Sequence, residues 1–192
     1  MCIRDSIETP AIYLDMSATG NLKEQYRVLG LRSFDTIPQL LKMVGLEDTG
    51  RKKAKNFSLG MRQRLGIAIA LVGNPSFLVL DEPTAGLDPK ERINIRNFVS
   101  ELSRECVVIF ATHVVSDVEC IAKEMILIKR GEIVRQDEIP KLIAEMDGLV
   151  WEFVAQENEV MSIQKEYLVS NLSVGKEGII VRAVGTLSLI HI

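Results

Sequence analysis

The sequence lacks the features that mark several large classes of protein. Its three cysteines, Cys2, Cys106 and Cys120, lie far apart, so they include none of the close pairs of a zinc site. They suit a reducing compartment, and Cys106 and Cys120 are interpreted as small core residues. The formal net charge is −3, which is not basic enough to indicate nucleic acid as a partner.

Long apolar runs are also missing. No run of apolar residues approaches the length that crosses a bilayer, so a role at a membrane would have to come through a partner. At 192 residues, 47% hydrophobic and 26% charged, the chain has the composition of an ordinary globular protein. Its length predicts one main domain with a small appendage.

The most informative part of the chain is a short apolar segment that ends in two acidic residues. Residues 77–80 are all apolar and lie between Pro75 and the pair Asp81-Glu82. This pattern predicts a strand buried on both faces. Open α/β sheets place ligands at the carboxyl ends of their strands, so Asp81 could hold Mg²⁺ through water and Glu82 could orient or deprotonate an attacking water. The alternative is that the two charges simply end the strand in solvent.

Two neighbouring segments favour the functional interpretation. Ser58 to Gly60 can cap a helix, whose free N–H groups attract phosphate. His113 follows a second apolar strand, residues 107–111, and is therefore predicted at the same sheet edge as Asp81. A lone histidine is more often structural than functional, but this position favours function.

In this order and spacing, the segments resemble the ATP-binding subunit of ABC transporters. Residues 57–61 resemble the family's signature sequence, residues 77–81 its Walker B strand, and residues 86–88 its D-loop. The resemblance implies that Glu82 is the catalytic glutamate and His113 the switch histidine. It implies Asp81 as the metal ligand. It implies nucleotide contacts for five further residues: Ser58, Gly60, Gln63, Asp88 and Glu8.

Some positions depart from the usual pattern of the family. Leu59 replaces the first of two glycines in the signature, and Met61 stands where glutamine is most common. Both changes resemble the subgroup that exports lantibiotic or bacitracin-like peptides. Glu8, followed two residues later by Pro10, resembles the Q-loop position of that subgroup. A surface carboxylate in a loop is the alternative for Glu8.

The resemblance implies an α/β fold, a partial P-loop NTPase (ABC ATPase) fold with a helical subdomain and a small C-terminal α+β appendage. We expect the Q-loop region and helical subdomain over residues 7–56, the catalytic core over 57–136, and the appendage over 137–186. Residues 1–6 and 187–192 resemble peptides translated from sequencing adapters, and they are left out of the fold prediction.

The resemblance also implies cofactors and partners. Two such subunits, identical or different, sandwich two ATP molecules with Mg²⁺, and a signature serine such as Ser58 serves the ATP of the partner subunit. The helical subdomain contacts a transmembrane permease. The subunit would therefore lie on the cytoplasmic face of the cell membrane, held there by the permease, and no nucleic acid partner is expected.

The phosphate loop of the family, Gly-x-x-x-x-Gly-Lys-Ser/Thr, is missing. The chain's Gly175-Lys176 pair is followed by Glu177 and preceded by Ser170 where the first glycine would stand. We therefore expect the later part of a subunit, inactive alone. Two alternatives remain: a regulatory module that lost the loop, and an ABC ATPase of translation or DNA repair. Residues 22–58 lack the sustained heptads of the chromosome-type relatives.

The remaining pattern predicts a series of helices and strands. Ser58 and Asp88 are expected as N-caps, with Pro89 in the first helical position. Residues 129–131 are expected to turn a hairpin. The helices are predicted over residues 21–31, 37–44, 58–71, 89–102, 114–122 and 139–146, and two further strands over 150–154 and 178–183.

Overall fold

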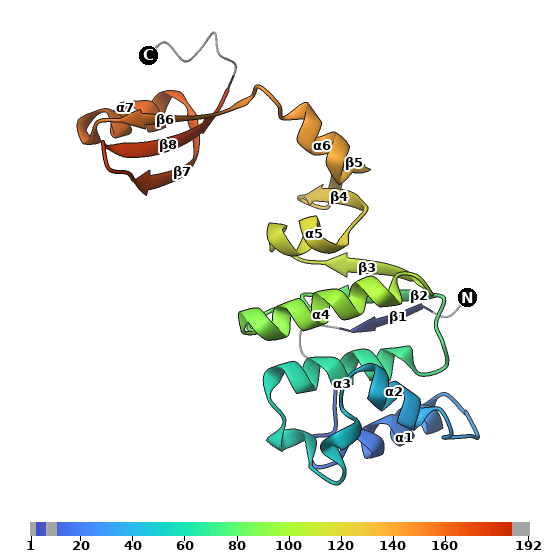
Figure 1. Cartoon of the computed structure of the whole chain (residues 1–192). Helices are drawn as coiled ribbons and strands as arrows, with labels where there is room; N and C mark the ends of the chain where they lie inside the picture. Colours follow the sequence, from blue (N-terminus) through green and yellow to red (C-terminus); the bar gives the residue numbers. More distant parts are fainter. Residues whose placement is uncertain (1–2, 7–10, 186–192) are drawn as a thin grey trace. The chain divides into compact units, whose positions relative to one another are not determined.

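The computed structural model describes residues 3–6 and 11–185, and the chain divides into two compact units, residues 1–122 and 123–192 (Figure 1). Glu8 lies outside the described residues. Each unit is described by itself. The second unit includes a hairpin that the sequence analysis assigned to the catalytic core.

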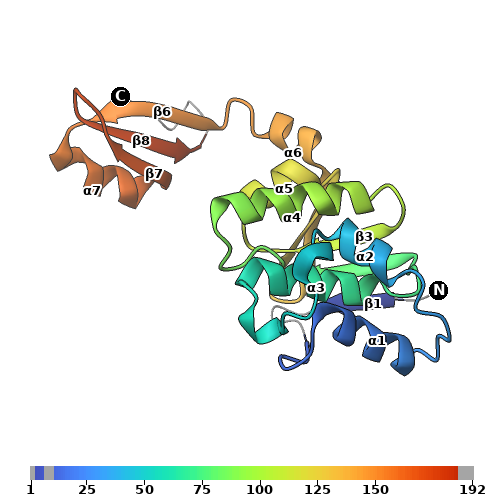
Figure 2. The same cartoon turned by 60° about the horizontal axis from the view of Figure 1, so that its bottom comes forward.

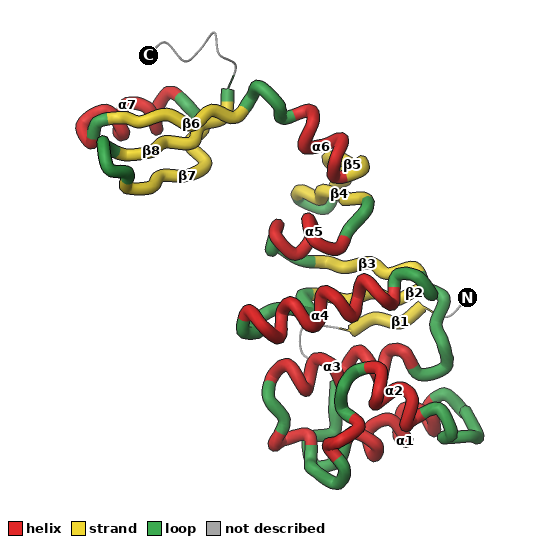
Figure 3. The backbone as a smooth tube through the Cα atoms, in the orientation of Figure 1, coloured by secondary structure: helices red, strands yellow, loops and turns green. Residues whose placement is uncertain are grey.

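The first unit contains both helices and strands, with a run of helices between its first two strands (Figure 3). Its elements are β1 (Ile3–Ser6), α1 (Ala18–Val28), α2 (Ile37–Met43), η1 (Glu47–Thr49), η2 (Ala54–Asn56), α3 (Leu59–Leu71), β2 (Phe77–Asp81), α4 (Pro89–Leu102), β3 (Val107–Ala111) and α5 (Val115–Ile121).

Three parallel strands form the sheet of this unit, in the order β1-β2-β3. β1 consists of residues that the sequence analysis left out of the fold. In the register between β2 and β3, Phe77 pairs with Val107 and Asp81 pairs with Ala111. Both strands therefore end at the same edge, which confirms the predicted proximity of Asp81 and the segment that leads to His113.

One face of the sheet belongs to the core. Leu78 and Leu80 are fully buried and form one cluster with apolar residues of α1 to α4. The helices α1 and α2 gather on the side of α3 that faces away from the sheet (Figures 1 and 2). α3 therefore has apolar neighbours on two sides, which explains why its sequence is apolar almost all round.

The opposite face of the sheet is more open than predicted. Phe77 and Val79 are only partly buried, so the prediction of a strand buried on both faces is correct for one face of β2 alone. Val107 is 60% exposed and Ile109 44%, so β3 is not a buried strand either. The physical reason is that these side chains lack a covering layer in the described chain.

Local capping explains where the helices begin. α1 starts three residues before the predicted Asn21, because the Ser17 side chain accepts a hydrogen bond from the Gly20 N–H at 3.1 Å. Ser58 caps α3 and Asp88 caps α4, as predicted. One face of α2, with Val44 just beyond its end, and one face of α4 are buried in the cluster, and Phe98 packs against its edge: Leu40, Leu41, Val44, Ile95, Val99 and Leu102.

The second unit contains a hairpin, two helices and a separate sheet. Its elements are β4 (Glu124–Lys129), β5 (Glu132–Glu138), α6 (Ile139–Glu145), β6 (Val150–Ala155), α7 (Glu157–Glu166), β7 (Leu168–Val174) and β8 (Ile179–Val184). The hairpin turns at Arg130 and Gly131, within the predicted turn. Both residues have positive φ. The antiparallel sheet has the order β6-β8-β7, and Trp151 on β6 donates its indole N–H to the Gly185 carbonyl at 3.0 Å.

The cysteines differ in their surroundings. Cys106 is partly buried, and this burial, with the nearby charge of Glu105, raises the pKa of its thiol. Cys120 is exposed, so its interpretation as a core residue is wrong. Its Sγ lies 3.4 Å from Arg96 Nη1 of α4, and the buried residue of α5 is Asp117 instead.

Candidate functional site

The candidate site lies where β2 and β3 end. Asp81 is the last residue of β2 and is exposed, and Glu82 follows it. The Glu82 N–H donates to the Ala111 carbonyl at 2.9 Å, so the pairing of the two strands continues one residue past β2. This places the residues that follow each strand next to one another.

Glu82 has an unusual backbone conformation, with φ at +45°. A non-glycine residue in the left-handed region costs on the order of 1–3 kcal/mol, and it persists where the surroundings fix it. For Glu82 these surroundings are the Ala111 carbonyl and a set of hydrogen bonds to its carboxylate. Such strained residues cluster at functional sites.

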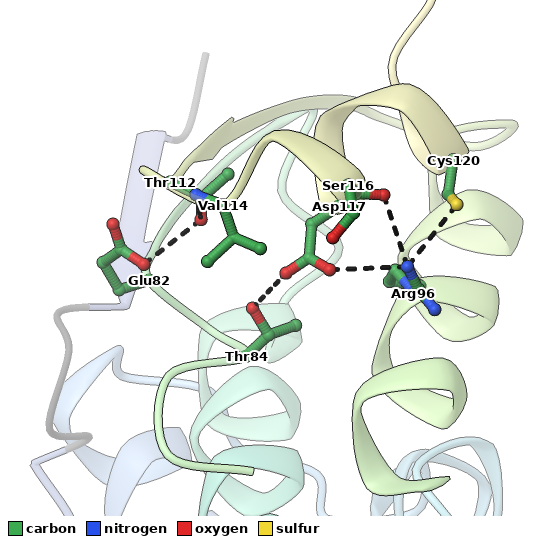
Figure 4. Close-up of polar contacts among 8 residues, drawn as sticks. All are labelled: Glu82, Thr84, Arg96, Thr112, Val114, Ser116, Asp117 and Cys120. Atoms are coloured by element: carbon green, nitrogen blue, oxygen red, sulfur yellow. Dashed lines mark hydrogen bonds and ion pairs between the residues drawn. The ribbon is translucent and has the colours of Figure 1, made fainter. Parts of the chain in front are cut away.

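The carboxylate of Glu82 is held by the segment after β3. Its Oε1 accepts a hydrogen bond from the His113 N–H at 2.8 Å and lies 2.6 Å from the His113 Nδ1. Its Oε2 accepts from the Thr112 hydroxyl at 3.2 Å (Figure 4). When Nδ1–H donates to Glu82, the imidazole presents Nε2 on its other side.

These contacts set the charge of Glu82. Burial raises its pKa, but the hydrogen bonds from the His113 ring, the His113 N–H and the Thr112 hydroxyl together outweigh burial, and the pKa lies below its usual value. The Glu82 side chain is 19% exposed and that of His113 is 80% exposed. The site therefore combines an ionised, mostly sheltered carboxylate with an imidazole open to a ligand.

The start of α3 forms the second part of the candidate site. The Ser58 side chain accepts a hydrogen bond from the Met61 N–H at 3.2 Å, and Ser58 is exposed. Gly60 is buried beneath Glu91 of α4: a Cβ atom on Gly60 would lie 2.7 Å from Glu91 Oε2. The exposed end of α3 offers free N–H groups beside a hydroxyl, an arrangement that suits a phosphate.

A turn links the two parts. Gly86 adopts φ +69°, and a Cβ there would lie 3.1 Å from the Leu59 side chain. The Asp88 side chain then caps α4 by accepting from the Glu91 N–H at 2.9 Å. Leu59, one of the departures in the signature-like segment, therefore packs against the D-loop-like turn at a position where glycine leaves room for it.

The candidate residues fall into distinct places. Asp81, Glu82 and His113 share one sheet edge, whereas Ser58 lies at the start of α3. Gln63 is 3% exposed within α3. The roles of all of these residues, and that of Glu8 outside the described range, stay predictions.

Comparison with known proteins places this arrangement in a family. A family model described as ABC transporter matches residues 8–85. The lantibiotic transport ATP-binding protein SrtF of Streptococcus pyogenes is 41% identical over 133 residues, which cover 69% of this chain and 58% of SrtF. Residues 8–85 of this chain belong to the ABC transporter family. The family match confirms the predicted partial P-loop NTPase fold.

Two further ABC proteins show how far the similarity extends. The bacitracin transport ATP-binding protein BcrA of Bacillus licheniformis is 30% identical over 179 residues, 91% of this chain and 58% of BcrA. The uncharacterized ABC transporter ATP-binding protein YxlF of Bacillus subtilis is 38% identical over 136 residues, 69% of this chain and 46% of YxlF. The chain thus spans about half the length of the curated relatives it matches.

The side chains of this ABC chain are compatible with a Mg²⁺ ion whose ligands are mainly nucleotide phosphate and water. Within residues 3–6 and 11–185, no three His, Cys, Asp or Glu side chains gather into a metal-binding group. Mg²⁺ bound with a nucleotide needs only one or two carboxylates beside phosphate and water, and the exposed Asp81 fits that requirement. In the described part of the chain, no helix is both long and apolar enough to span a membrane.

The sequence analysis missed several residues that shape this ABC site. Thr112 and Glu91 contact predicted site residues, and Thr84 and Asp117 form a buried pair next to them. Thr112 directly precedes His113, so its position was a usable signal. Nothing in the local sequence separates Asp117 from the exposed Glu119 of the same helix.

Proposed function

We propose that this chain is part of an ATP-hydrolysing subunit that powers an ABC transporter. The observation that carries the proposal is the contact between Glu82 and His113, which joins the ends of β2 and β3 at the sheet edge where such folds bind ligands. The relatives cited above are transport ATP-binding proteins, which supports transport over a role in translation or DNA repair.

The geometry supports a role for each residue. Glu82, ionised and oriented by two donors of His113, is suited to accept a proton from an attacking water. His113 presents Nε2 on the side of its ring away from Glu82, and the exposed imidazole is suited to contact a terminal phosphate. Asp81 is suited to hold Mg²⁺, which supplies charge stabilisation when it is bound. Phosphoryl transfer needs mainly positioning and charge stabilisation, and these residues provide both.

The start of α3 is suited to a second nucleotide. Ser58 is exposed and lies on a different part of the unit from Glu82, so one chain would serve two nucleotides in a pair of subunits. Gly60, Gln63 and Asp88 belong to the same proposed surface, in which Gln63 would act from within α3. When two subunits pair, closure of the dimer depends on ATP and reopening on its hydrolysis. This motion of the subunits, on the cytoplasmic face of the membrane, drives a transmembrane permease.

The proposed cargo is a peptide antibiotic. This proposal rests on the names of two relatives, the lantibiotic protein SrtF and the bacitracin protein BcrA. Leu59 and Met61, the two departures in the signature, point in the same direction. The residues singled out in the described part of this chain belong to a nucleotide site. The cargo itself would therefore bind to the permease.

The 192 residues contain no phosphate loop, so we propose that they do not hydrolyse ATP alone. The test begins with the source DNA upstream of residue 1. A Gly-x-x-x-x-Gly-Lys-Ser/Thr loop in the same frame, followed by Mg²⁺-dependent ATP hydrolysis by the extended protein, would support the proposed function. The absence of such a loop, or hydrolysis by the 192 residues alone, would count against it.

A second test uses the substitution Glu82→Gln in the extended protein. This change keeps the size of the side chain but removes the base, so we expect hydrolysis to fall by roughly 10²-fold or more while ATP binding persists. Normal steady-state hydrolysis by this variant would exclude Glu82 as the base.

A further inference from the structure

Asp117 is a buried carboxylate that the proposed chemistry does not use. It lies in the first turn of α5 and has no exposed surface. A buried charge is costly unless it is well partnered. Among the described residues, the other buried polar side chains are uncharged: Asn21, Gln63 and Thr84. The partners of Asp117 therefore explain why the fold retains it.

Two side chains from different segments hold this carboxylate. The Thr84 hydroxyl donates to Asp117 Oδ2 at 2.5 Å within the buried interior. Arg96 of α4 places Nη1 3.5 Å from Asp117 Oδ1 and donates to the Ser116 carbonyl at 3.3 Å. Figure 4 shows the carboxylate between the hydroxyl and the guanidinium. Three segments of the chain thus meet at one side chain.

The first of these segments begins at the catalytic candidate. Thr84 is two residues beyond Glu82, and the Ala85 N–H donates to the Glu82 carbonyl at 3.0 Å, which closes a tight turn. The bond from Thr84 to Asp117 therefore fixes the turn that leaves Glu82. Without that bond, the turn directly after the strained backbone of Glu82 loses its side-chain anchor.

The second segment returns to the same carboxylate from the other side. The Asp117 N–H donates to the Val114 carbonyl at 3.0 Å, and the Val114 N–H donates to the Thr112 hydroxyl at 3.0 Å. That hydroxyl donates to Glu82 Oε2. The hydrogen bonds and the short chain segments between them thus form a closed ring that passes through Glu82 and the residues on both sides of His113.

We propose that Asp117 is a positioning residue, which holds the turn after Glu82 and the segment that carries His113 in one arrangement through Thr84 and Arg96. The role of Glu82 in hydrolysis rests on the proposed function, whereas the ring itself is a feature of this chain. The positioning role of Asp117 therefore has a test that needs no ATP hydrolysis.

The test follows the NMR chemical shift of the His113 backbone amide proton in the 192-residue chain at one fixed pH. That N–H donates to Glu82 Oε1 at 2.8 Å, so its shift reports how the two segments are held together. Thr84→Val removes the hydroxyl and nearly preserves the volume, so the turn after Glu82 is released and we expect the amide shift to change. Thr84→Ser keeps the hydroxyl, and we expect its amide shift to match that of the unmodified chain.

A matched variant separates positioning from general loss of stability. Leu41→Ala removes buried apolar volume from α2, which destabilises the fold but leaves the ring intact. We expect the chemical shift of the His113 amide to be unchanged in this variant. An unchanged amide shift in Thr84→Val, or an equal change in Leu41→Ala, would overturn the proposal.

Asp117→Asn provides a second variant if Thr84→Val does not fold. It keeps an acceptor for Thr84 but removes the charge that faces Arg96, and a changed His113 amide shift is again expected. In the extended protein, the same variants should lower kcat by roughly 10–100-fold with little change in KM for ATP, as a displaced catalytic group does. An extended protein that never hydrolyses ATP contradicts the proposed function, while the amide shift still decides the role of Asp117.

Discussion

The carboxylate of Glu91 fills the space that a side chain on Gly60 would occupy. A Cβ on Gly60 would lie 2.7 Å from Glu91 Oε2 and 3.1 Å from Glu91 Cγ. The same carboxylate lies 3.7 Å from Arg64, so it is held from a second side. A side chain at Gly60 therefore requires Glu91 to move, whether or not a nucleotide is bound.

This packing predicts a coupling between two substitutions. Gly60→Ala displaces Glu91 and weakens its ion pair with Arg64, which we expect to lower the free energy of unfolding by about 1 kcal/mol. In a Glu91→Ala background the obstacle is gone, and the same change should be neutral or stabilising because alanine favours the helix. Urea unfolding followed by circular dichroism measures both. Equal effects in the two backgrounds would contradict the packing role.

The depressed pKa of Glu82 predicts that the stability of the fold depends on pH. Because its pKa is depressed in the folded state, its ionised form stabilises the fold above the usual pKa near 4.5, and this contribution is lost as the pH falls below that value. Between about pH 5 and pH 3, the unmodified chain should therefore lose more stability than Glu82→Gln. Urea unfolding at several pH values tests this expectation, and parallel curves for the two proteins would refute it.

Asp88 predicts a stability effect that is separate from any nucleotide contact. Its side chain caps α4 through the Glu91 N–H. Asp88→Ala removes the cap and should cost about 1 kcal/mol in the free energy of unfolding. Asp88→Asn keeps an acceptor and serves as the control, with a much smaller loss. If both variants lost the same stability, the charge rather than the cap would be responsible.

The backbone conformation of Gly86 predicts a larger loss of stability on substitution than the one expected for Asp88→Ala. Its φ of +69° is strained for any residue with a Cβ, and Leu59 packs against it. Gly86→Ala should destabilise the chain by roughly 1–2 kcal/mol. A second change, Leu59→Ala, should relieve only the steric part, so the double variant remains less stable than Leu59→Ala alone. Thermal unfolding provides the comparison, and a neutral Gly86→Ala would contradict it.

Much of the fold could be predicted because its signals are local. The caps at Ser58 and Asp88, the apolar run of β2 and the hairpin at Arg130 each depend on a few neighbouring residues. The meeting of the ends of β2 and β3 was also predictable, because parallel strands with apolar sequences align their carboxyl ends.

Other elements gave no such signal. α7 has no fully buried residue, and only three of its ten residues are apolar: Val160, Met161 and Ile163. β7 contains an irregularity between Val169 and Asn171, which breaks the alternation expected of a strand. The bond from Thr84 to Asp117 joins residues 33 positions apart. No periodicity or spacing reveals such a bond before the fold is known.

The position of Trp151 has a practical consequence. It is the single tryptophan of the chain, and its indole is fixed on β6 of the second unit. Its fluorescence emission therefore acts as a built-in optical label for that unit. The imidazole resonances of His113 can serve the first unit in the same way. The two halves of the chain can thus be observed separately in one sample without attaching a dye.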